Sequence, residues 1–283
     1  MRNVEVIKLE EEELENFKKT DIFKKIDKSM FSEVDCIFMN TLIKEYKPKK
    51  ILEIGAGFGF SSSVILNAIK DDPDAKLYST DYNSTLPANN GDVMLIGYHV
   101  DSFPELKAKW KLYAGCGFVS NVIGEIGSGI DFVFLDTMHR NPGEILDLLM
   151  VLPFLNNGAI IVIHDIALDK IYFKTGKAKE AKITQTCAIL YSALNGKTLI
   201  IDGCDSFDIQ RDVNIGAKKL EYHPMDIAHS LFYLLTLKWS QQEIVMYLEN
   251  EKNIIDYFTT YYSYYYSNYL TNIFDYQKQI LKY

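Results

Sequence analysis

The feature that most constrains the fold is a series of short segments that are apolar along nearly their whole length and alternate with helical patterns. Five such segments follow one another, at Lys50–Ile54, Lys76–Thr80, Lys111–Ala114, Asp131–Leu135 and Ala159–Ile163. A strand that is apolar on both sides must be covered on both sides, which is typical of a parallel sheet between two layers of helices. The pattern therefore predicts a doubly wound, mostly parallel α/β sheet.

The segments around these strands divide the chain into three regions. Helices are predicted at Phe31–Tyr46, Ser61–Lys70, Phe118–Ile126 and residues 141–155, and two weaker strands at Thr198–Asp202 and Ile215–Leu220. Because the alternation covers the middle of the chain, we expect a helical lead-in at residues 1–48, a sheet domain at 49–222 and a helical extension at 223–283.

The C-terminal extension is rich in tyrosine, with nine between residues 257 and 283. One interpretation is an aromatic docking surface for a second subunit, which would make a homo-oligomer, or a lid over the functional site. The other is a helical extension whose tyrosines pack on the sheet or reflect biased composition, because aromatic residues commonly serve in packing.

Charge and cysteine usage exclude several kinds of function. The chain of 283 residues has 30 Lys and Arg against 38 Asp and Glu, a net charge of −8, which argues against nucleic acid as the main partner. The four cysteines are scattered without a CxxC pair, which favours reduced thiols over a zinc cluster or disulfides; they are Cys36, Cys116, Cys187 and Cys204.

The N-terminus lacks a secretory signal, and no apolar run approaches the ~20 residues that span a bilayer, so we expect a cytoplasmic protein.

A glycine-rich turn follows the first strand of the predicted sheet. Residues Gly55, Gly57 and Gly59 follow Glu53 with the spacing G-x-G-x-G. Open parallel sheets bind ligands beyond the carboxyl ends of their strands, and glycines let a ligand approach the backbone there. The dinucleotide fingerprint G-x-G-x-x-G would need a glycine where Phe60 stands, which disfavours a nicotinamide oxidoreductase.

Two later strands end in acidic residues at the same predicted edge. Asp136 follows one strand, with His139 three residues on, and His164-Asp165 end the next. Carboxylates that meet there could hold a hard divalent cation, which would lower the pKa of a bound hydroxyl. His139 could then take the proton, because histidine titrates near working pH. The alternative interpretation is structural: Asp165 caps a turn, Asp136 positions a ligand without metal, and His139 is a solvated loop residue.

The glycine turn with its preceding acid resembles motif I of class I S-adenosylmethionine (SAM)-dependent methyltransferases. The resemblance implies a Rossmann-like, seven-stranded methyltransferase sheet, with residues 49–222 as the SAM-binding domain. In that family Glu53 would face the ammonium side of SAM, Asp81 would bind the ribose hydroxyls and Cys116 would lie near adenine. The cofactor-binding residues that it implies are Glu53, Gly55, Ala56, Gly57, Gly59, Ser62, Asp81 and Cys116.

Two longer stretches resemble O-methyltransferases. DFVFLDTMHRNPGEILDLLMVLPFLNNGAIIVIHDI resembles macrolide-sugar O-methyltransferases, and MFSEVDCIFMNTLIKEYKPKKILEIG resembles catechol-type O-methyltransferases. The resemblance implies Asp136 as ligand of Mg²⁺ or another hard divalent cation, His139 as base and Asp165 as a further ligand. The chain departs from both groups here: it has Asp165-Ile166 where catechol-type enzymes carry Asp-Asn, and His164-Asp165 where the sugar enzymes carry an acidic pair. The third ligand is therefore His164, a water or nothing.

These features lead to one function and several alternatives. We expect a SAM-dependent O-methyltransferase acting on a hydroxyl of a small molecule, such as a sugar, glycolipid headgroup or secondary metabolite. One alternative is a metal-independent N- or protein methyltransferase, although the Asn/Asp-Pro-Pro-Tyr-like signature is absent at Asp136-Thr137-Met138-His139. The other is a non-catalytic SAM-binding subunit whose tyrosine-rich extension recruits partners.

Overall fold

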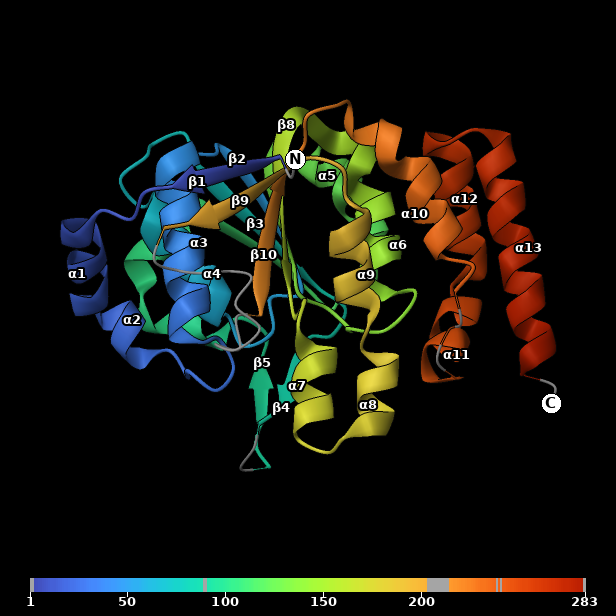
Figure 1. Cartoon of the computed structure of the whole chain (residues 1–283), viewed down its shortest axis with the longest axis horizontal. Helices are drawn as coiled ribbons and strands as arrows, with labels where there is room; N and C mark the ends of the chain where they lie inside the picture. Colours follow the sequence, from blue (N-terminus) through green and yellow to red (C-terminus); the bar gives the residue numbers. More distant parts are fainter. Residues whose placement is uncertain (1–2, 89–90, 203–213, 238, 240, 282–283) are drawn as a thin grey trace.

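The computed structural model describes residues 3–88, 91–202, 214–237, 239 and 241–281, and Cys204 lies outside them. Its centre is one eight-stranded sheet of order β1-β9-β10-β8-β7-β2-β3-β6 (Figure 1). The strands are β1 (Val4–Ile7), β2 (Lys50–Ile54), β3 (Lys76–Asp81), β6 (Trp110–Ala114), β7 (Ile130–Leu135), β8 (Leu155–His164), β9 (Lys197–Ile201) and β10 (Ile215–Lys219). β10 is antiparallel to β8 and β9, and the other pairs are parallel, so the predicted mostly parallel sheet is confirmed.

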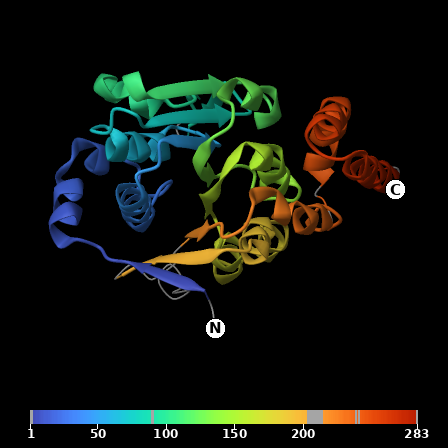
Figure 2. The same ribbon diagram turned by 90° about the horizontal axis from the view of Figure 1, so that it is seen from above.

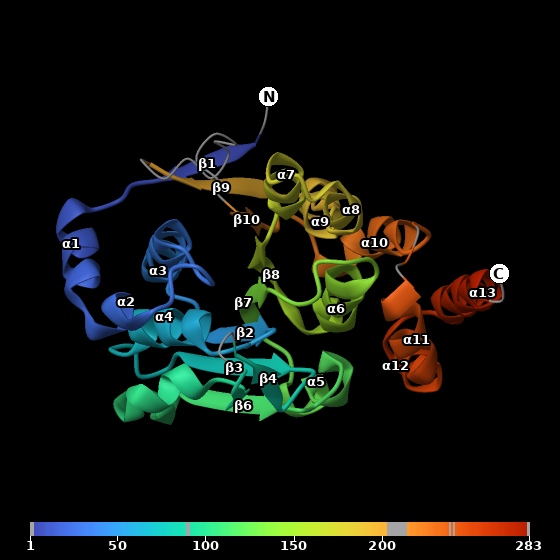
Figure 3. The same cartoon turned by 90° about the horizontal axis from the view of Figure 1, so that it is seen from below.

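Helices cover both faces of the sheet (Figure 3). One face carries α3 (Glu33–Tyr46) and α4 (Phe60–Ile69), and the other carries α5 (Ile123–Ile126), α6 (Gly143–Val151), α9 (Thr186–Ala193) and α10 (Ala228–Leu234). Alternate strand residues serve the two layers: Phe132 and Phe134 pack with α3 and α4, whereas Val133 and Leu135 pack with α6. Burial on both faces explains why the strands are apolar throughout.

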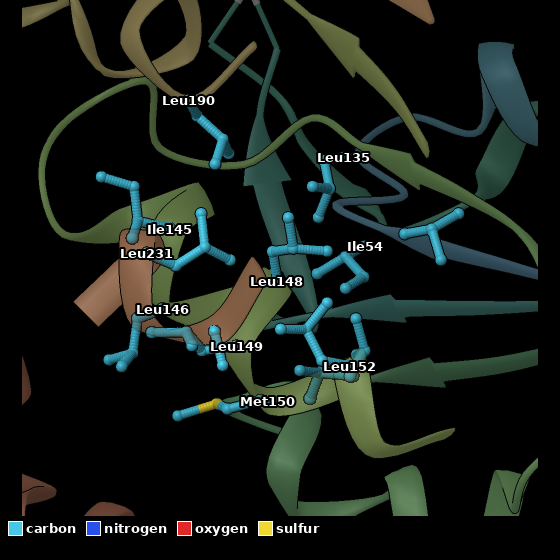
Figure 4. Packing of buried hydrophobic residues seen from close by; sticks show 14 of the residues in the cluster. Ile54, Leu135, Ile145, Leu146, Leu148, Leu149, Met150, Leu152, Leu190 and Leu231 are labelled. Atoms are coloured by element: carbon cyan, nitrogen blue, oxygen red, sulfur yellow. The ribbon is translucent and has the colours of Figure 1, made fainter. Parts of the chain in front are cut away.

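Helix α6 is the centre of the larger core. Its residues Ile145, Leu148 and Leu149 are fully buried, and Figure 4 shows them among Ile54 of β2, Leu135 of β7, Leu190 of α9 and Leu231 of α10. All of its residues are buried, including Glu144 and Asp147, and a helix that is buried all round fits only where other elements surround it. The position of α6 matters for function because it starts just after the loop that follows β7.

The first residues differ from the predicted helical lead-in. Val4–Ile7 form β1, which pairs in parallel with β9 at the edge of the sheet, and the helices begin only at α1 (Glu11–Lys19) and α2 (Asp21–Lys25). The strand is only partly covered, and Val6 is 60% exposed. Three of its four residues are β-branched, which is typical of a strand, but the strand is short and a charged segment follows it, which led to the helical interpretation.

The carboxyl edge of the sheet carries two insertions that the sequence did not indicate. They are the hairpin β4 (Thr85–Pro87) and β5 (Val93–Leu95), and the helix pair α7 (Leu168–Lys174) and α8 (Ala178–Ile183). Figure 1 shows both projecting beyond the same end of the sheet. The predicted helix at residues 118–126 is also broken, into a 3₁₀ turn at Val119–Asn121 and the short α5.

The C-terminal extension forms α10, α11 (Gln241–Glu249), α12 (Glu251–Tyr261) and α13 (Tyr264–Ile280) on the α6 side of the sheet (Figure 2). Two of its tyrosine hydroxyls, those of Tyr257 and Tyr262, donate hydrogen bonds to the carbonyl oxygens of Met150 and Leu149. These tyrosines pack against helix α6 and not directly on the sheet. Among the helices that the structure describes, none is both apolar and long enough to cross a membrane.

Candidate active site

The glycine turn joins β2 to α4 through backbone conformations that favour glycine. Gly55, Gly57 and Gly59 have φ values of +92°, +50° and +87°. A Cβ atom on Gly55 would lie 1.8 Å from the carbonyl oxygen of Asp136, and one on Gly59 would lie 2.8 Å from Cα of Gly97. The first and last glycines are therefore required by close backbone approach, whereas a Cβ on Gly57 would meet nothing within 4 Å.

Glu53 lies beneath this turn. Its side chain is fully buried and accepts hydrogen bonds from the hydroxyls of Ser61, Ser62 and Ser79 at 2.6, 2.5 and 2.5 Å. Burial raises the pKa of Glu53 to about 7, although the three hydroxyls oppose the shift. Because of these contacts, the carboxylate is directed into the space under α4, where it supports the turn from below.

Asp81 ends β3 beside the glycine turn. Its carboxylate accepts hydrogen bonds from the backbone N–H groups of Gly57 and Asn83, both at 2.9 Å. Burial raises the pKa of Asp81, the two backbone N–H groups lower it, and the charge of Asp136 raises it further. The carboxylate thus braces the turn and still borders the cavity described next.

A cavity of about 410 Å³ lies beyond the carboxyl ends of these strands. Of the residues predicted to bind a cofactor, it is lined by Gly55, Ala56, Gly57 and Asp81. Glu53, Gly59, Ser62 and Cys116 do not line it, and their neighbours Ser61 and Gly117 do. The rest of the lining includes Asp136, Asp147, Phe118 and the side chains of Met30, Phe31, Met246 and Tyr247 from the two ends of the chain.

The four residues predicted around the metal and base come together at the ends of β7 and β8. The His139 Nε2 atom lies 2.9 Å from Oδ2 of Asp165 and 3.7 Å from Oδ1 of Asp136. The His164 Nδ1 atom lies 3.4 Å from Oδ1 of Asp136 and 3.5 Å from Oδ2 of Asp165. We call Asp136, His139, His164 and Asp165 the acid–histidine cluster.

Further polar residues hold this cluster from outside. Glu144 accepts a hydrogen bond from the backbone N–H of His139 at 2.6 Å and lies 3.4 Å from its Nδ1 atom. Asp35 lies 3.3 Å from Nε2 of His164, and Asn214 donates to Asp165. Sequence reasoning missed all three, because they are far apart along the chain and Asp35 also completes a capping box with Ser32.

In the cluster, burial and the attraction between histidines and carboxylates shift the pKa values in opposite directions. Burial by itself lowers the pKa values of His139 and His164, but contacts with carboxylates hold both well above the ordinary value. Burial likewise raises the pKa of Asp165, and the two histidines hold it well below its ordinary range. His139 and Asp165 also have positive φ values, +58° and +56°, a strained conformation for residues other than glycine that often marks a functional site.

The donor set fits a hard cation. Ligand atoms of Asp136, His139 and Asp165 all lie within 4.8 Å of one another. A cation such as Mg²⁺ holds its ligands at roughly 2.1 Å, which puts adjacent ligands about 3 Å apart. The buried Nδ1 atom of His164 has no hydrogen-bond partner among the described residues, so it is a further candidate ligand. The carboxylates suit Mg²⁺ or Mn²⁺, and an imidazole ligand would shift the preference from Mg²⁺ toward a transition-metal ion.

Residues 52–166 match the family model of a methyltransferase domain. The matched segment is less than half of the chain, but it runs from β2 to the end of β8 and contains the glycine turn, Asp81, Asp136 and Asp165. This part of the chain is therefore similar to methyltransferase domains. No curated protein matches the chain in sequence at a significant level.

The chain is also similar to solved structures of methyltransferases. A putative caffeoyl-CoA O-methyltransferase from Staphylococcus aureus is 13% identical with a TM-score of 0.49, over 73% of this chain and 96% of that one. The SAH-bound methyltransferase PaMTH1 from Podospora anserina is 14% identical with a TM-score of 0.48, over 75% and 87%. The O-methyltransferase TomG from Streptomyces achromogenes, involved in tomaymycin synthesis and solved with SAM, is 13% identical with a TM-score of 0.43, over 75% and 91%. Similarities this distant transfer neither substrate nor residue roles.

Proposed function

We propose that this protein is a SAM-dependent O-methyltransferase that acts on a hydroxyl of a small molecule or sugar with the help of a divalent cation. The observation that carries the proposal is that a single cavity is bordered by the glycine turn, Asp81 and Asp136. Asp136 is also a member of the acid–histidine cluster. A cofactor held by the turn would therefore lie next to the groups that could activate an acceptor.

The residues around the turn are suited to a nucleoside with a positively charged amino-acid part. Asp81 would accept hydrogen bonds from ribose hydroxyls, which is supported by its position at a strand end in the lining of the cavity. The open space beside Gly57 lets the ligand lie against the backbone. Glu53, with its three serine partners, shapes the turn from below.

The acid–histidine cluster would hold Mg²⁺ or a similar ion through Asp136 and Asp165, with His139 or His164 as the nitrogen ligand. When bound, such an ion lowers the pKa of the acceptor hydroxyl. Glu144, Asp35 and Asn214 fix the orientation of the two imidazoles and of Asp165. The charge of a bound ion would oppose the carboxylates that hold the pKa values of the two histidines high, and would favour neutral imidazoles. The imidazole that does not bind the ion could then take the acceptor proton, and we assign this role to His139, whose side chain is 25% exposed.

A second cavity, of about 300 Å³, is lined by His139 and is a suitable place for the acceptor. Met138 lines both cavities. Apart from Met138 and Leu168, the lining of the second cavity is polar or aromatic: His139, Arg140, Tyr172, Glu180, Thr184 and Glu243. Carboxylates together with an aromatic ring suit a polyhydroxylated molecule, which offers both hydroxyl donors and an apolar face.

The test combines metal dependence with a variant of Asp136. Purified protein is supplied with SAM and a panel of sugars, glycosides and catechols, and SAH formation is measured with EDTA and after Mg²⁺ is restored. We expect turnover to disappear with EDTA and return with Mg²⁺. Asp136→Asn should lower turnover by about 10³-fold, with SAH affinity changed less than about threefold. Asp256→Asn, on the exposed face of α12, is the control and should behave like the wild type.

Binding of Mn²⁺ alone, followed by electron paramagnetic resonance, gives a readout that does not need the acceptor. Asp136→Asn should weaken Mn²⁺ binding by at least about tenfold. Turnover that is insensitive to EDTA together with unchanged Mn²⁺ binding would contradict the role of the metal. Equal losses of SAH affinity and turnover in Asp136→Asn would contradict the separation between cofactor and acceptor groups.

A further inference from the structure

Three carboxylates line the large cavity, and the proposed function uses only two of them. Asp81 and Asp136 have been assigned, which leaves Asp147 of helix α6. Asp147 is 6% exposed, and its Oδ2 atom accepts a hydrogen bond from the hydroxyl of Thr137 at 3.0 Å. Among the described residues, this hydroxyl is the one hydrogen-bond donor shown to reach the carboxylate. A carboxylate has room for several donors, so Asp147 offers unused acceptor capacity at the cavity wall.

The surroundings of Asp147 are apolar and aromatic. Phe118 and Tyr247 stack with their ring centres 5.0 Å apart and their planes at 21°, and both line the cavity with Met246. Tyr247 is 1% exposed and its hydroxyl contacts the sulfur of Met138. Burial raises the pKa of Asp147 to about 7, and the charge of Glu144 adds to the shift. An N–H donor from a ligand would relieve the cost of keeping this carboxylate out of water.

The position of this end of the cavity relative to Asp81 indicates which part of a nucleoside reaches it. The thiol of Cys116 donates to the carbonyl oxygen of Asp81 at 3.4 Å, and Asp147 is close enough to that thiol to raise its pKa, although burial is the larger cause. Gly117 and Phe118 continue from there along the cavity wall. A ribose bound at Asp81 thus has its base directed toward Phe118 and Asp147.

We propose that Asp147 accepts a hydrogen bond from the exocyclic 6-amino group of adenine and so selects adenine over other purines. Phe118, Met246 and Tyr247 form the walls that contact the faces of the base, which gives the C-terminal extension a part in cofactor recognition. Residues 115–117, which follow β6, read Gly-Cys-Gly and carry no carboxylate, whereas Asp147 of α6 lines the cavity. The inference rests on the proposed function, because it assumes that the ligand is SAM.

The experiment compares the reaction product with an analogue in which the 6-amino group of the purine is replaced by a 6-oxo group, with a proton on N1. S-adenosylhomocysteine carries a 6-amino group and S-inosylhomocysteine a 6-oxo group, and calorimetry measures the affinity of each. A hydrogen bond to a charged group corresponds to about 10–150-fold in affinity, so wild-type protein should prefer the adenosyl compound by at least tenfold. Asp147→Asn supplies an amide that can donate to the 6-oxo group, and the preference should fall below about threefold.

The outcomes separate recognition from a structural role. If Asp147 only supports Thr137, the Asn variant will lower the affinity for both compounds equally and leave their ratio unchanged, which overturns the proposal. Thr137→Val removes the neighbouring hydroxyl but keeps the carboxylate, so the preference for the adenosyl compound should persist in that control. If wild-type protein binds neither compound, the proposed function fails together with this inference.

Discussion

The backbones of Gly55 and Asp136 approach each other closely in the site. The substitution Gly55→Ala tests whether this approach leaves no room for a side chain. A Cβ atom at Gly55 would lie 1.8 Å from the carbonyl oxygen of Asp136, so the two strand ends would have to separate by about 1.5 Å to reach an ordinary contact. The positive φ costs about 1–2 kcal/mol for alanine, and the forced shift of packed backbone adds about 1–3 kcal/mol. We therefore expect Gly55→Ala to lower the free energy of unfolding by about 2–5 kcal/mol.

Two other glycines supply matched controls in urea unfolding and SAH calorimetry. Gly176, in the turn between α7 and α8, has φ +79° and would place its Cβ atom in open space, so its alanine variant should lose only about 1–2 kcal/mol. Gly57 has equally free space, but that space is the cavity, so Gly57→Ala should resemble Gly176→Ala in stability and lose at least tenfold in SAH affinity. If Gly55→Ala is no less stable than Gly176→Ala, the close approach of the two strand ends is refuted.

Two further predictions concern stability. The pKa of Glu53 is raised from 4.5 to about 7, so the folded protein holds this proton more tightly than the unfolded chain, and stability falls as the pH rises between these values. The free energy of unfolding of Glu53→Gln should decrease by about 3 kcal/mol less between pH 5 and pH 8 than that of the wild type, as measured by urea unfolding at the two pH values. The same decrease in both proteins would contradict the burial of the carboxylate. Tyr262→Phe should cost about 1–3 kcal/mol because it leaves the buried carbonyl oxygen of Leu149 without its donor, whereas Tyr265→Phe, at an exposed position, should cost nearly nothing. Equal effects of the two tyrosine variants would contradict the packing of the extension on α6.

The sheet could be predicted because its strands are buried on both faces, and this leaves an unmistakable apolar pattern. The same reasoning failed for β1, since an edge strand such as Val4–Ile7 is half exposed and carries charge. It also gave no sign of α7 and α8, which carry no buried residues apart from Ala181 and thus lack a strong apolar stripe.

Within the site, the residues at strand ends were predictable and those that support them were not. Asp136 and Asp165 follow two neighbouring parallel strands, so topology alone brings them to one edge. Glu144 and Asp35 reach the cluster from helices, where a single acidic residue has no distinguishing pattern. Glu53 was expected to face the ligand, but the alternation of side chains along β2 directs it to the serines of α4.

Calorimetry with S-adenosylhomocysteine and, separately, with NADH tests the central claim that the turn at Gly55–Gly59 holds a SAM-type nucleoside. We expect one molecule of the homocysteine nucleoside to bind per chain with an affinity in the micromolar range or tighter, and no heat from NADH. Saturable binding of NADH with no response to S-adenosylhomocysteine would contradict the claim.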